Sequence, residues 1–247
     1  MDPRYQPPTA NIDRDDSEFR DLDVLTTTVR WLLIAGIALG LLNLVTSEMQ
    51  LEMLSRSFTR EEAAANAQLV AAAVGLISLC TLATIVFFGR WIYLAHRNLP
   101  ELGATRLEMP PGWAVGWFFV PIANLWKPYQ AMRSLWRSSH DVVRPELQDS
   151  TWVLPTWWTV WLISTILGNV ETQMAMVANT PSELSRATEA SMIHFGIDLV
   201  RNIVAIVLVT RIWRAQQAQH ENPGEFAPAP GFADAPAAPA AGMTESV

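Results

Sequence analysis

The apolar residues of this chain gather in four long blocks that polar segments separate. The blocks cover residues 32–45, 69–88, 152–170 and 192–212. With flanking tolerant residues, each block approaches or reaches the roughly 20 residues that a helix needs to cross a bilayer. Soluble core helices do not account for four such blocks in 247 residues. We therefore predict an all-α, polytopic integral membrane protein, with spans at about 29–46, 68–89, 152–170 and 191–212.

Two polar sequences mark the beginnings of the second and fourth predicted helices. Thr59 precedes Glu62 by three residues, and Thr180 precedes Glu183 by the same distance. This is the capping-box spacing, in which each of the two side chains binds the backbone of the other residue. Pro181 also occupies the first helical position, where its missing N–H costs nothing. Because both starts lie several residues before the apolar blocks, these two helices should project beyond the bilayer on one side.

A fifth apolar run, from Trp113 to Trp126, is too short to cross in the same way. As a helix, its 14 residues would reach only ~21 Å, against a hydrocarbon core of ~30 Å. Pro121 and Asn124 interrupt the run. Irregular backbone at membrane depth needs protein or water to satisfy its polar groups, so both residues should face protein. Length alone leaves three arrangements open: re-entry, an interfacial position or a crossing.

The distribution of basic residues chooses among these arrangements. Of the 17 basic residues, 16 are Arg, a bias typical of a GC-rich bacterial genome. A crossing at 113–126 would place Lys127, Arg133 and Arg137 outside, against the rule that basic residues stay in the cytoplasm. Four crossings with a cytoplasmic N-terminus put 13 basic residues inside and three outside. We therefore expect two helical hairpins in the bacterial cytoplasmic membrane, with both termini in the cytoplasm. Residues 112–139 would form a short re-entrant or interfacial helical segment between the hairpins.

The net charge of −7 belongs to the two ends of the chain. Residues 1–28 and 215–247 each carry a net charge of −4, which leaves +1 for the residues between them. We interpret residues 1–21 as a disordered acidic tail, residues 22–215 as the membrane domain and residues 216–247 as a disordered tail rich in Ala and Pro. The remaining basic residues lie beside membrane segments, so nucleic acid is not an expected partner.

The residues that follow the short apolar run have the pattern of an amphipathic helix at a membrane surface. Tyr129, Met132, Leu135 and Trp136 share one face, and basic residues flank that face. A basic edge suits anionic lipid headgroups, and tryptophans are typical of the boundary between membrane and water. The candidate contacts for lipid or a partner protein are Trp113, Trp117, Asn124, Trp126, Lys127, Arg133, Trp136 and Arg137.

The same region resembles a known family. The run Arg90-Trp-Ile-Tyr-Leu-Ala-His-Arg-Asn-Leu-Pro-Glu-Leu-Gly103 is followed by Pro111-Gly-Trp-Ala-Val-Gly-Trp-Phe-Phe-Val-Pro-Ile-Ala-Asn-Leu-Trp-Lys-Pro-Tyr-Gln-Ala-Met-Arg-Ser-Leu-Trp136. Together they are similar to the signature of a bacterial membrane protein family called DUF4328, a domain of unknown function. The resemblance is strong over residues 89–140 and looser over about 25–215. It implies a multi-span membrane domain with disordered termini, and it brings no activity, cofactor or site residue.

Asp198 and Arg201 are the only charged side chains well inside a predicted span. Their i, i+3 spacing puts them on one helix face, where they can pair. Ionisable residues inside a membrane indicate a functional site by default, such as a proton relay or a solute site. A self-neutralised pair that faces the bundle interior is the structural alternative, and the short spacing favours it. Both interpretations stay open.

Few residues suggest catalysis or metal binding. Cys80 is the sole cysteine, which excludes disulfides and thiolate metal sites within the chain. The four histidines lack metal-ligand spacing, and His96, at the end of the second predicted helix, is expected to be solvated. No nucleophile elbow, phosphate loop or His-Glu-x-x-His motif occurs. We therefore expect neither an enzyme nor a cofactor.

Two functions fit these features. The first is a non-enzymatic membrane module whose central block, residues 89–140, forms an inner-leaflet platform for anionic lipid, another membrane protein or a second copy of the chain. The second is a small transporter or channel subunit that uses Asp198, Arg201 and the broken 113–126 segment as a site within the membrane. A hydrated cavity that joins Asp198, Asn124 and Arg90 would favour the second function, and a dry bundle would favour the first.

Overall fold

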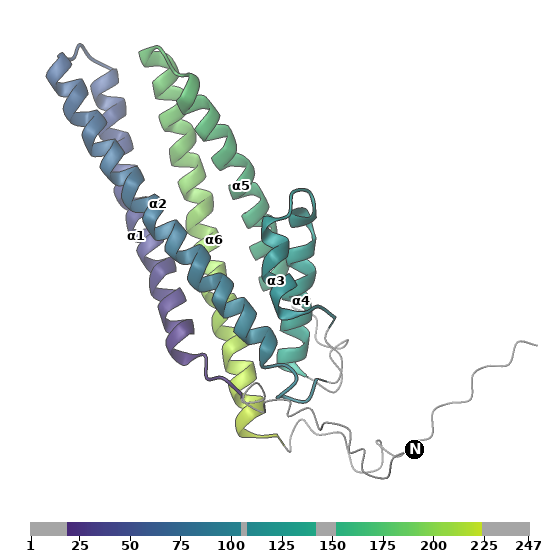
Figure 1. The fold of residues 1–247 in the computed structure, drawn as a ribbon. Helices are drawn as coiled ribbons and strands as arrows, with labels where there is room; N and C mark the ends of the chain where they lie inside the picture. The colour runs from purple at the N-terminus through teal and green to yellow at the C-terminus, as the bar shows by residue number, and fades with distance from the viewer. Residues whose placement is uncertain (1–18, 105–107, 142–151, 224–247) are drawn as a thin grey trace, which may run out of the picture.

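The computed structural model describes residues 19–104, 108–141 and 152–223, and every regular element in these ranges is helical (Figure 1). In chain order the elements are α1 (Asp23–Leu54), α2 (Arg60–Arg97), α3 (Pro111–Gly116), η2 (Trp117–Phe119), η3 (Ala123–Leu125), α4 (Lys127–His140), α5 (Val153–Val177) and α6 (Pro181–Glu221). The all-α prediction is confirmed over these residues. The short elements from α3 to α4 connect the long helices α2 and α5.

Four of these helices, α1, α2, α5 and α6, are long and apolar enough to cross a membrane. Their lengths are 32, 38, 25 and 41 residues. Each contains one predicted span, except that Trp152 caps the start of α5 instead of lying within it. At 1.5 Å per residue, α2 and α6 reach roughly 57 and 62 Å, so both are longer than a bilayer core is thick, as expected. Only 6% of the most apolar window of α2 is buried within the protein, so its outer side suits lipid better than water.

Both predicted capping boxes form. Thr59 Oγ1 accepts a hydrogen bond from the backbone N–H of Glu62 (3.1 Å), and the Glu62 carboxylate accepts one from the Thr59 N–H (2.8 Å). Thr180 and Glu183 repeat the two bonds at 3.3 and 3.0 Å. Each box satisfies N–H groups that the first turn of a helix leaves without partners. These polar sequences therefore set where α2 and α6 begin.

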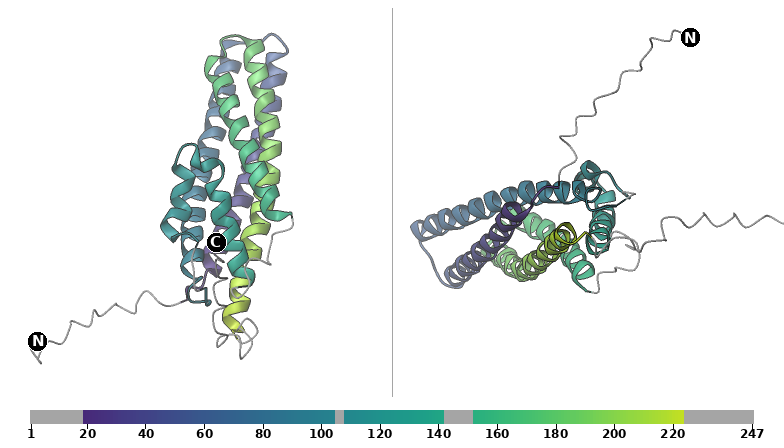
Figure 2. Two further views of the ribbon diagram at one scale, coloured as in Figure 1. Left: turned by 90° about the vertical axis from the view of Figure 1, so that its right-hand side faces the viewer. Right: turned by 90° about the horizontal axis from the view of Figure 1, so that it is seen from below.

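The four long helices run alternately in opposite directions (Figure 1 and Figure 2). α1 packs along α2 and α6, and α5 packs along α6, whereas α2 and α5 make few contacts with each other. The loops 55–59 and 178–180 lie at one end of the molecule, which we call the loop end. α1 begins and α6 ends at the opposite end, which we call the terminus end.

The connection between α2 and α5 folds back on itself in the terminus half of the molecule. α3 packs against α2 and α4 against α6, and the turn that joins α3 to α4 points toward the loop end (Figure 1 and Figure 2). α4 buries the face that carries Ala131, Met132 and Leu135, so the predicted apolar face of this helix packs on the bundle. The connection therefore fills part of the space between α2 and α5.

The segment 113–126 is not one continuous helix. It divides among α3, η2 and η3, and the chain turns at Ile122, whose φ is 67°. Pro121 is exposed, contrary to the expectation that it faces protein. The turn closes hydrogen bonds of its own instead, such as the one from the Asn124 N–H to the Val120 carbonyl (3.0 Å). Irregular backbone that satisfies its own polar groups needs no covering helix.

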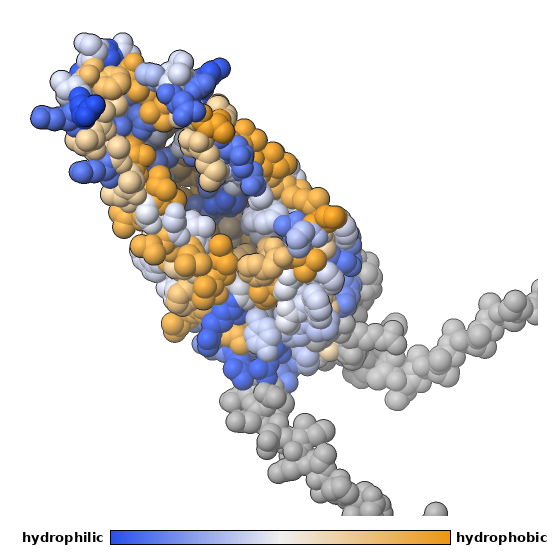
Figure 3. Space-filling view, turned by 45° about the horizontal axis from the view of Figure 1, so that its top comes forward, coloured by the Kyte–Doolittle hydropathy of each residue, from blue (hydrophilic) through white to orange (hydrophobic). Residues whose placement is uncertain are grey.

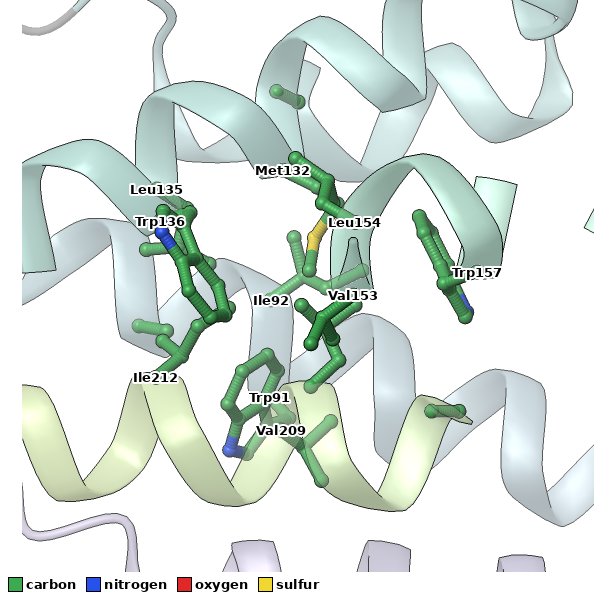
Figure 4. Packing of buried hydrophobic residues seen from close by; sticks show 14 of the residues in the cluster. Trp91, Ile92, Met132, Leu135, Trp136, Val153, Leu154, Trp157, Val209 and Ile212 are labelled. Carbon is green, nitrogen blue, oxygen red and sulfur yellow. The ribbon is translucent and has the colours of Figure 1, made fainter. Parts of the chain in front are cut away.

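The apolar core joins this connection to the long helices (Figure 4). Trp91 is 0% exposed, and its indole Nε1 donates a hydrogen bond to Thr26 Oγ1 (2.8 Å). The labelled members of the same cluster are Ile92, Met132, Leu135, Trp136, Val153, Leu154, Trp157, Val209 and Ile212. They come from α2, α4, α5 and α6, near the terminus end. Tight apolar packing is therefore concentrated in one half of the bundle.

Buried polar side chains join the helices at the terminus end. Gln216 Nε2 donates to the Ala95 carbonyl (2.9 Å) and to Ser139 Oγ (3.0 Å), and Gln219 Nε2 donates to the Ser139 carbonyl (2.7 Å). α6 therefore continues to Glu221, six residues beyond the predicted end of the membrane domain at 215. Most of both predicted tails lies outside the described residues.

His96 is buried at the same end of the molecule. It is 1% exposed, with Nδ1 2.9 Å from the Ile92 carbonyl oxygen and Nε2 3.3 Å from the Ala131 carbonyl oxygen. α4 covers this position, and a contact between residues 35 positions apart leaves no trace in the local sequence pattern. The expectation of a solvated His96 is therefore wrong.

Candidate functional site

A crevice of about 600 Å³ occupies the loop half of the molecule, between the α1–α2 pair and the α5–α6 pair. α1 and α6 pack together behind it, and residues of α2 and α5 line its two sides. Val115, Phe118 and Trp161 line its end nearest the core. In Figure 3 it is the hollow between the two upper arms, with hydrophilic residues at its floor. A second cavity of about 510 Å³ lies nearer the loop end and shares the lining residues Gln50, Val70, Val74 and Leu184 with the crevice.

Four ionisable side chains form a hydrogen-bonded network on one wall of the crevice. His194, Asp198 and Arg201 follow each other on α6 at i, i+4 and i+7, so they share one face. Arg201 Nη1 lies 2.8 Å from Asp198 Oδ1, and His194 Nε2 lies 3.5 Å from the same oxygen. From α5, Glu171 Oε2 lies 2.6 Å from His194 Nδ1. The four side chains are 21% to 27% exposed, so each remains partly open to the cavity.

Ser164 links the charged groups across the interface between α5 and α6. Its hydroxyl accepts a hydrogen bond from Arg201 Nη1 (2.6 Å) and donates one to Asp198 Oδ1 (2.5 Å). Ser164 is only 2% exposed. Asn202 Oδ1 accepts a longer bond from Arg201 Nη2 (3.4 Å). The structure therefore brings the predicted pair, Asp198 and Arg201, together and ties both members to a neighbouring helix.

Uncharged polar side chains line the crevice nearer the loop end. Asn43 Nδ2 donates to Ser191 Oγ (3.1 Å), and Gln50 Nε2 donates to Thr188 Oγ1 (3.0 Å). Both bonds join α1 to α6. The back wall of the crevice therefore carries polar groups from Gln50 down to Arg201, whereas α2 contributes no charged side chain to the lining.

Glycines allow the helices to come close together around this network. A Cβ atom at Gly40 would lie 1.7 Å from Phe195 Cε2, and one at Gly168 would lie 2.9 Å from His194 Cε1. Real Cβ atoms essentially never approach other atoms so closely. Any larger residue would force the neighbouring side chain to shift, so these glycines let α1 and α5 pack against the wall of α6 that carries the network.

The sequence indicates two members of the network and misses the others. His194 could be found from its spacing, because it lies four residues before Asp198 on the same helix face. Glu171 and Ser164 belong to another helix, and only the packing of α5 on α6 brings them to the site. Metal-ligand spacing therefore does not identify His194, whose ring nitrogens contact carboxylates on two helices.

The predicted contacts of the central block lie in different environments. The exposed members are Trp113, Trp126 and Arg133, and the half-buried members are Trp117, Asn124, Lys127 and Arg137. Lys127 Nζ lies 5.6 Å from the ring centroid of Trp117, within the range of a cation–π interaction. None of these residues lines the crevice, and neither does Arg90. The crevice therefore joins Asp198 to Arg201 but not to Asn124 or Arg90.

Trp136 lies inside the bundle, although the pattern suggested a position at the membrane boundary. It is 6% exposed, and its ring stacks on that of His140 with 4.2 Å between centroids. The face of α4 that carries it packs on the other helices, so lipid does not reach the ring.

The pKa of His140 lies below its ordinary value, chiefly because the imidazole is buried. The Trp136 carbonyl, 2.8 Å from His140 Nδ1, raises this pKa, and the charge of Arg211 lowers it.

Comparison with protein families matches residues 55–214 to a model described as a domain of unknown function, DUF4328. The match runs from the start of α2 through most of α6, so it includes the charged network and the α3–α4 connection. The resemblance of the central motif to this family is therefore confirmed. No curated protein and no solved structure matches the chain. Among the residues that the structure describes, no group of three or more His, Cys, Asp or Glu side chains is arranged to hold a metal ion.

Proposed function

This chain belongs to the DUF4328 family, and we propose that it is a non-enzymatic membrane protein that binds a small molecule in the crevice between its two helix pairs. The observation that carries this proposal is the charged network on the wall of a cavity of about 600 Å³. A cavity of this size, largely apolar with a few convergent polar groups, is typical of small-molecule sites.

In this proposal, α1, α2, α5 and α6 cross a bacterial cytoplasmic membrane as two hairpins. The excess of basic residues in the sequence segments 1–30, 89–151 and 211–247, 13 against three in the other connecting segments, supports a cytoplasmic position for both termini. The α3–α4 connection then enters the membrane from the cytoplasmic side and returns to it. Its tip carries Ile122 and Leu125, which are 72% and 54% exposed and would face lipid.

The partial exposure of the network favours binding over a purely structural role. Charged groups lose several kcal/mol of hydration on transfer to a low-dielectric interior, and a pair that only holds helices together is best closed off by its neighbours. Here Asp198 and Arg201 keep 25% and 27% of their side-chain surface open. Ionisable groups that face a cavity within a membrane mark substrate or ion pathways. We therefore favour the functional interpretation of this pair.

The shape of the crevice indicates where a ligand enters. The second cavity adjoins the crevice on the side of the loop end, while the core and Phe118 lie on the side of the terminus end. With the termini in the cytoplasm, the ligand would enter from outside the cell. A transporter that is open to one side would have the same form.

Cys80 offers a direct test, because it is the sole cysteine and lines the crevice. Maleimides react with the thiolate, which forms where water reaches the sulfur. In intact cells, a membrane-impermeant maleimide should label Cys80 through the loop end. The matched control is Leu79→Cys with Cys80→Ser, which moves the thiol to a neighbouring position that is 66% exposed outside the crevice. Labelling of Cys80 no faster than in this lipid-facing control would contradict a hydrated crevice.

The orientation has its own test in the Cys80→Ser background. Ser182→Cys lies just inside α6 at the loop end, and Ser138→Cys lies on α4 in the terminus half. The impermeant reagent should reach the first from outside intact cells and the second only after the membrane is opened. The reverse pattern would overturn the proposed orientation. The proposal of a hydrated crevice would then be decided by the labelling of Cys80 alone.

A second role, as a lipid contact, rests on the α3–α4 connection. Trp113 and Trp126 are exposed, and Lys127 and Arg133 lie on the same connection. Tryptophan and basic residues together suit the interface with anionic headgroups. In native mass spectrometry, a Lys127→Gln, Arg133→Gln double variant should retain less phosphatidylglycerol than the native chain. Equal retention would count against this role.

A further inference from the structure

The charges that line the crevice do not balance unless a histidine is protonated. Among the described lining residues, the charged or titratable groups are Glu171 on α5, His194, Asp198 and Arg201 on α6, and Cys80 on α2, while α1 contributes none. Two carboxylates therefore face one guanidinium. With His194 neutral the crevice carries one net negative charge, and with His194 protonated it carries none.

Among the charged groups of the network, His194 is the one whose protonation can change the net charge of the crevice. Nδ1 lies 2.6 Å from Glu171 Oε2, so this nitrogen donates its proton to the carboxylate. Nε2 lies 3.5 Å from Asp198 Oδ1, and it holds a proton as well only in the imidazolium form. Arg201 is already engaged with Asp198 (2.8 Å) and Ser164 (2.6 Å). Histidine is the side chain whose charge ordinarily changes near neutral pH.

Six aromatic side chains also line the cavity. The rings in the lining are those of Phe88, Phe118, Phe119, Trp157, Trp161 and Phe195. The faces of aromatic rings attract organic cations, and they also offer apolar contact. An anion would lie beside two carboxylates without gaining from these rings. The lining is therefore best suited to a molecule with a positive charge and an apolar body.

On the basis of the function proposed above, we propose that the ligand of this crevice is a monovalent, amphipathic organic cation that exchanges for one proton. When the cation binds, its positive charge replaces that of protonated His194 in neutralising Glu171 and Asp198. His194 then releases the proton on Nε2 to water, and the imidazole keeps its bond from Nδ1 to Glu171. The net charge of the crevice is zero before and after the exchange, so no uncompensated charge is left inside the membrane.

Two ions of matched shape and opposite charge provide the test. Radiolabelled tetraphenylphosphonium and tetraphenylborate are each added to the full chain in phosphatidylcholine nanodiscs. The measurements are made at about pH 8 and about pH 5.5, on either side of the ordinary histidine pKa. Tetraphenylphosphonium should bind saturably and bind more weakly at the lower pH. In weakly buffered solution at that pH it should release close to one proton for each ion bound. Tetraphenylborate should not bind saturably.

Three variants separate the roles of the charged groups. Glu171→Gln should weaken tetraphenylphosphonium binding by at least about 30-fold, the loss expected when one partner of a desolvated ion pair is removed. His194→Gln should keep binding but lose the pH dependence and the proton release, because no exchangeable proton remains. Glu189→Gln is the matched control, since Glu189 lies on the same helix, is exposed and does not line the crevice. It should bind as the native chain does.

The outcomes distinguish this inference from the function on which it rests. Saturable binding of tetraphenylborate but not tetraphenylphosphonium, with protection of Cys80 from maleimide, would overturn the cation assignment and leave the crevice as a ligand site. Binding of tetraphenylphosphonium that His194→Gln leaves equally dependent on pH would overturn the proton exchange. If neither ion binds and neither protects Cys80, both proposals fail. A Glu171→Gln variant that does not fold leaves the decision to His194→Gln and to the comparison of the two ions.

Discussion

Replacing Gly40 with alanine tests the close contact between α1 and Phe195 of α6. The added Cβ atom would lie 1.7 Å from Phe195 Cε2 and 2.1 Å from Phe195 Cδ2. This overlap can be relieved only if the Phe195 ring turns or the two helices separate. Phe195 lines the crevice and follows His194 directly in the chain, so either response also disturbs the charged network.

The expected loss of stability follows from overpacking. Forcing an extra methyl group into a well-packed contact costs about 1–3 kcal/mol. Alanine also favours a helix over glycine by up to about 1 kcal/mol, so the raw change understates the overlap. Gly75→Ala on α2 and Gly196→Ala on α6 are matched controls, because a Cβ atom at either position meets nothing within 4 Å. Relative to these controls, Gly40→Ala should lower the free energy of unfolding by about 1–3 kcal/mol.

Thermal unfolding in a mild detergent, followed by tryptophan fluorescence, measures this difference. The Gly40→Ala, Phe195→Leu double variant should recover part of the loss, because the smaller side chain vacates the overlapped space. The reasoning is refuted if Gly40→Ala unfolds at the same temperature as Gly75→Ala, since α1 and α6 would then be farther apart than the structure has them.

Three further predictions concern single contacts. Ser164→Ala removes the hydroxyl that lies between Asp198 and Arg201. It should lower the free energy of unfolding by about 1.5–3 kcal/mol, as for a hydrogen bond to a charged group. The control is Thr165→Val, whose hydroxyl bonds to the Trp161 carbonyl of its own helix, and an equal loss in both variants would contradict the prediction. Thr26→Val leaves the buried Trp91 Nε1 without its acceptor and should cost about 1–3 kcal/mol in the same assay, whereas a neutral effect would argue against the bond. For His140, burial holds the pKa below its ordinary value of about 6.5, so the unfolded chain binds a proton first as the pH falls. The stability that goes with neutral His140 is therefore fully present above that pH and is lost below it, and His140→Phe should show a smaller drop in unfolding temperature between about pH 7.5 and about pH 5.5 than the native chain. An equal drop would rule out this contribution.

The parts of the fold that were predictable depend on neighbouring residues. Helix caps such as Thr59 with Glu62 act over three residues, so their spacing in the sequence already contains the geometry. The membrane-crossing length of the four apolar blocks is also a local property. His96 and Trp136 show the limit of this reasoning, because the packing of α4 on the bundle buries both. An amphipathic pattern shows that a helix has an apolar face, but it does not say whether lipid or protein covers that face.

The candidate site divides in the same way. The sequence by itself determined four apolar helices, the starting points of α2 and α6, and one charged pair, Asp198 and Arg201, because hydrophobic length, capping-box spacing and i, i+3 spacing are properties of a single helix. Only the tertiary structure decided that Ser164 and Glu171 join this pair, and that Glu171, Asp198 and Arg201 face a cavity rather than a closed interface. The physical reason is that a cavity depends on how several helices meet. Here α1 comes close to α6 at Gly40, while α2 and α5 stay apart above the α3–α4 connection.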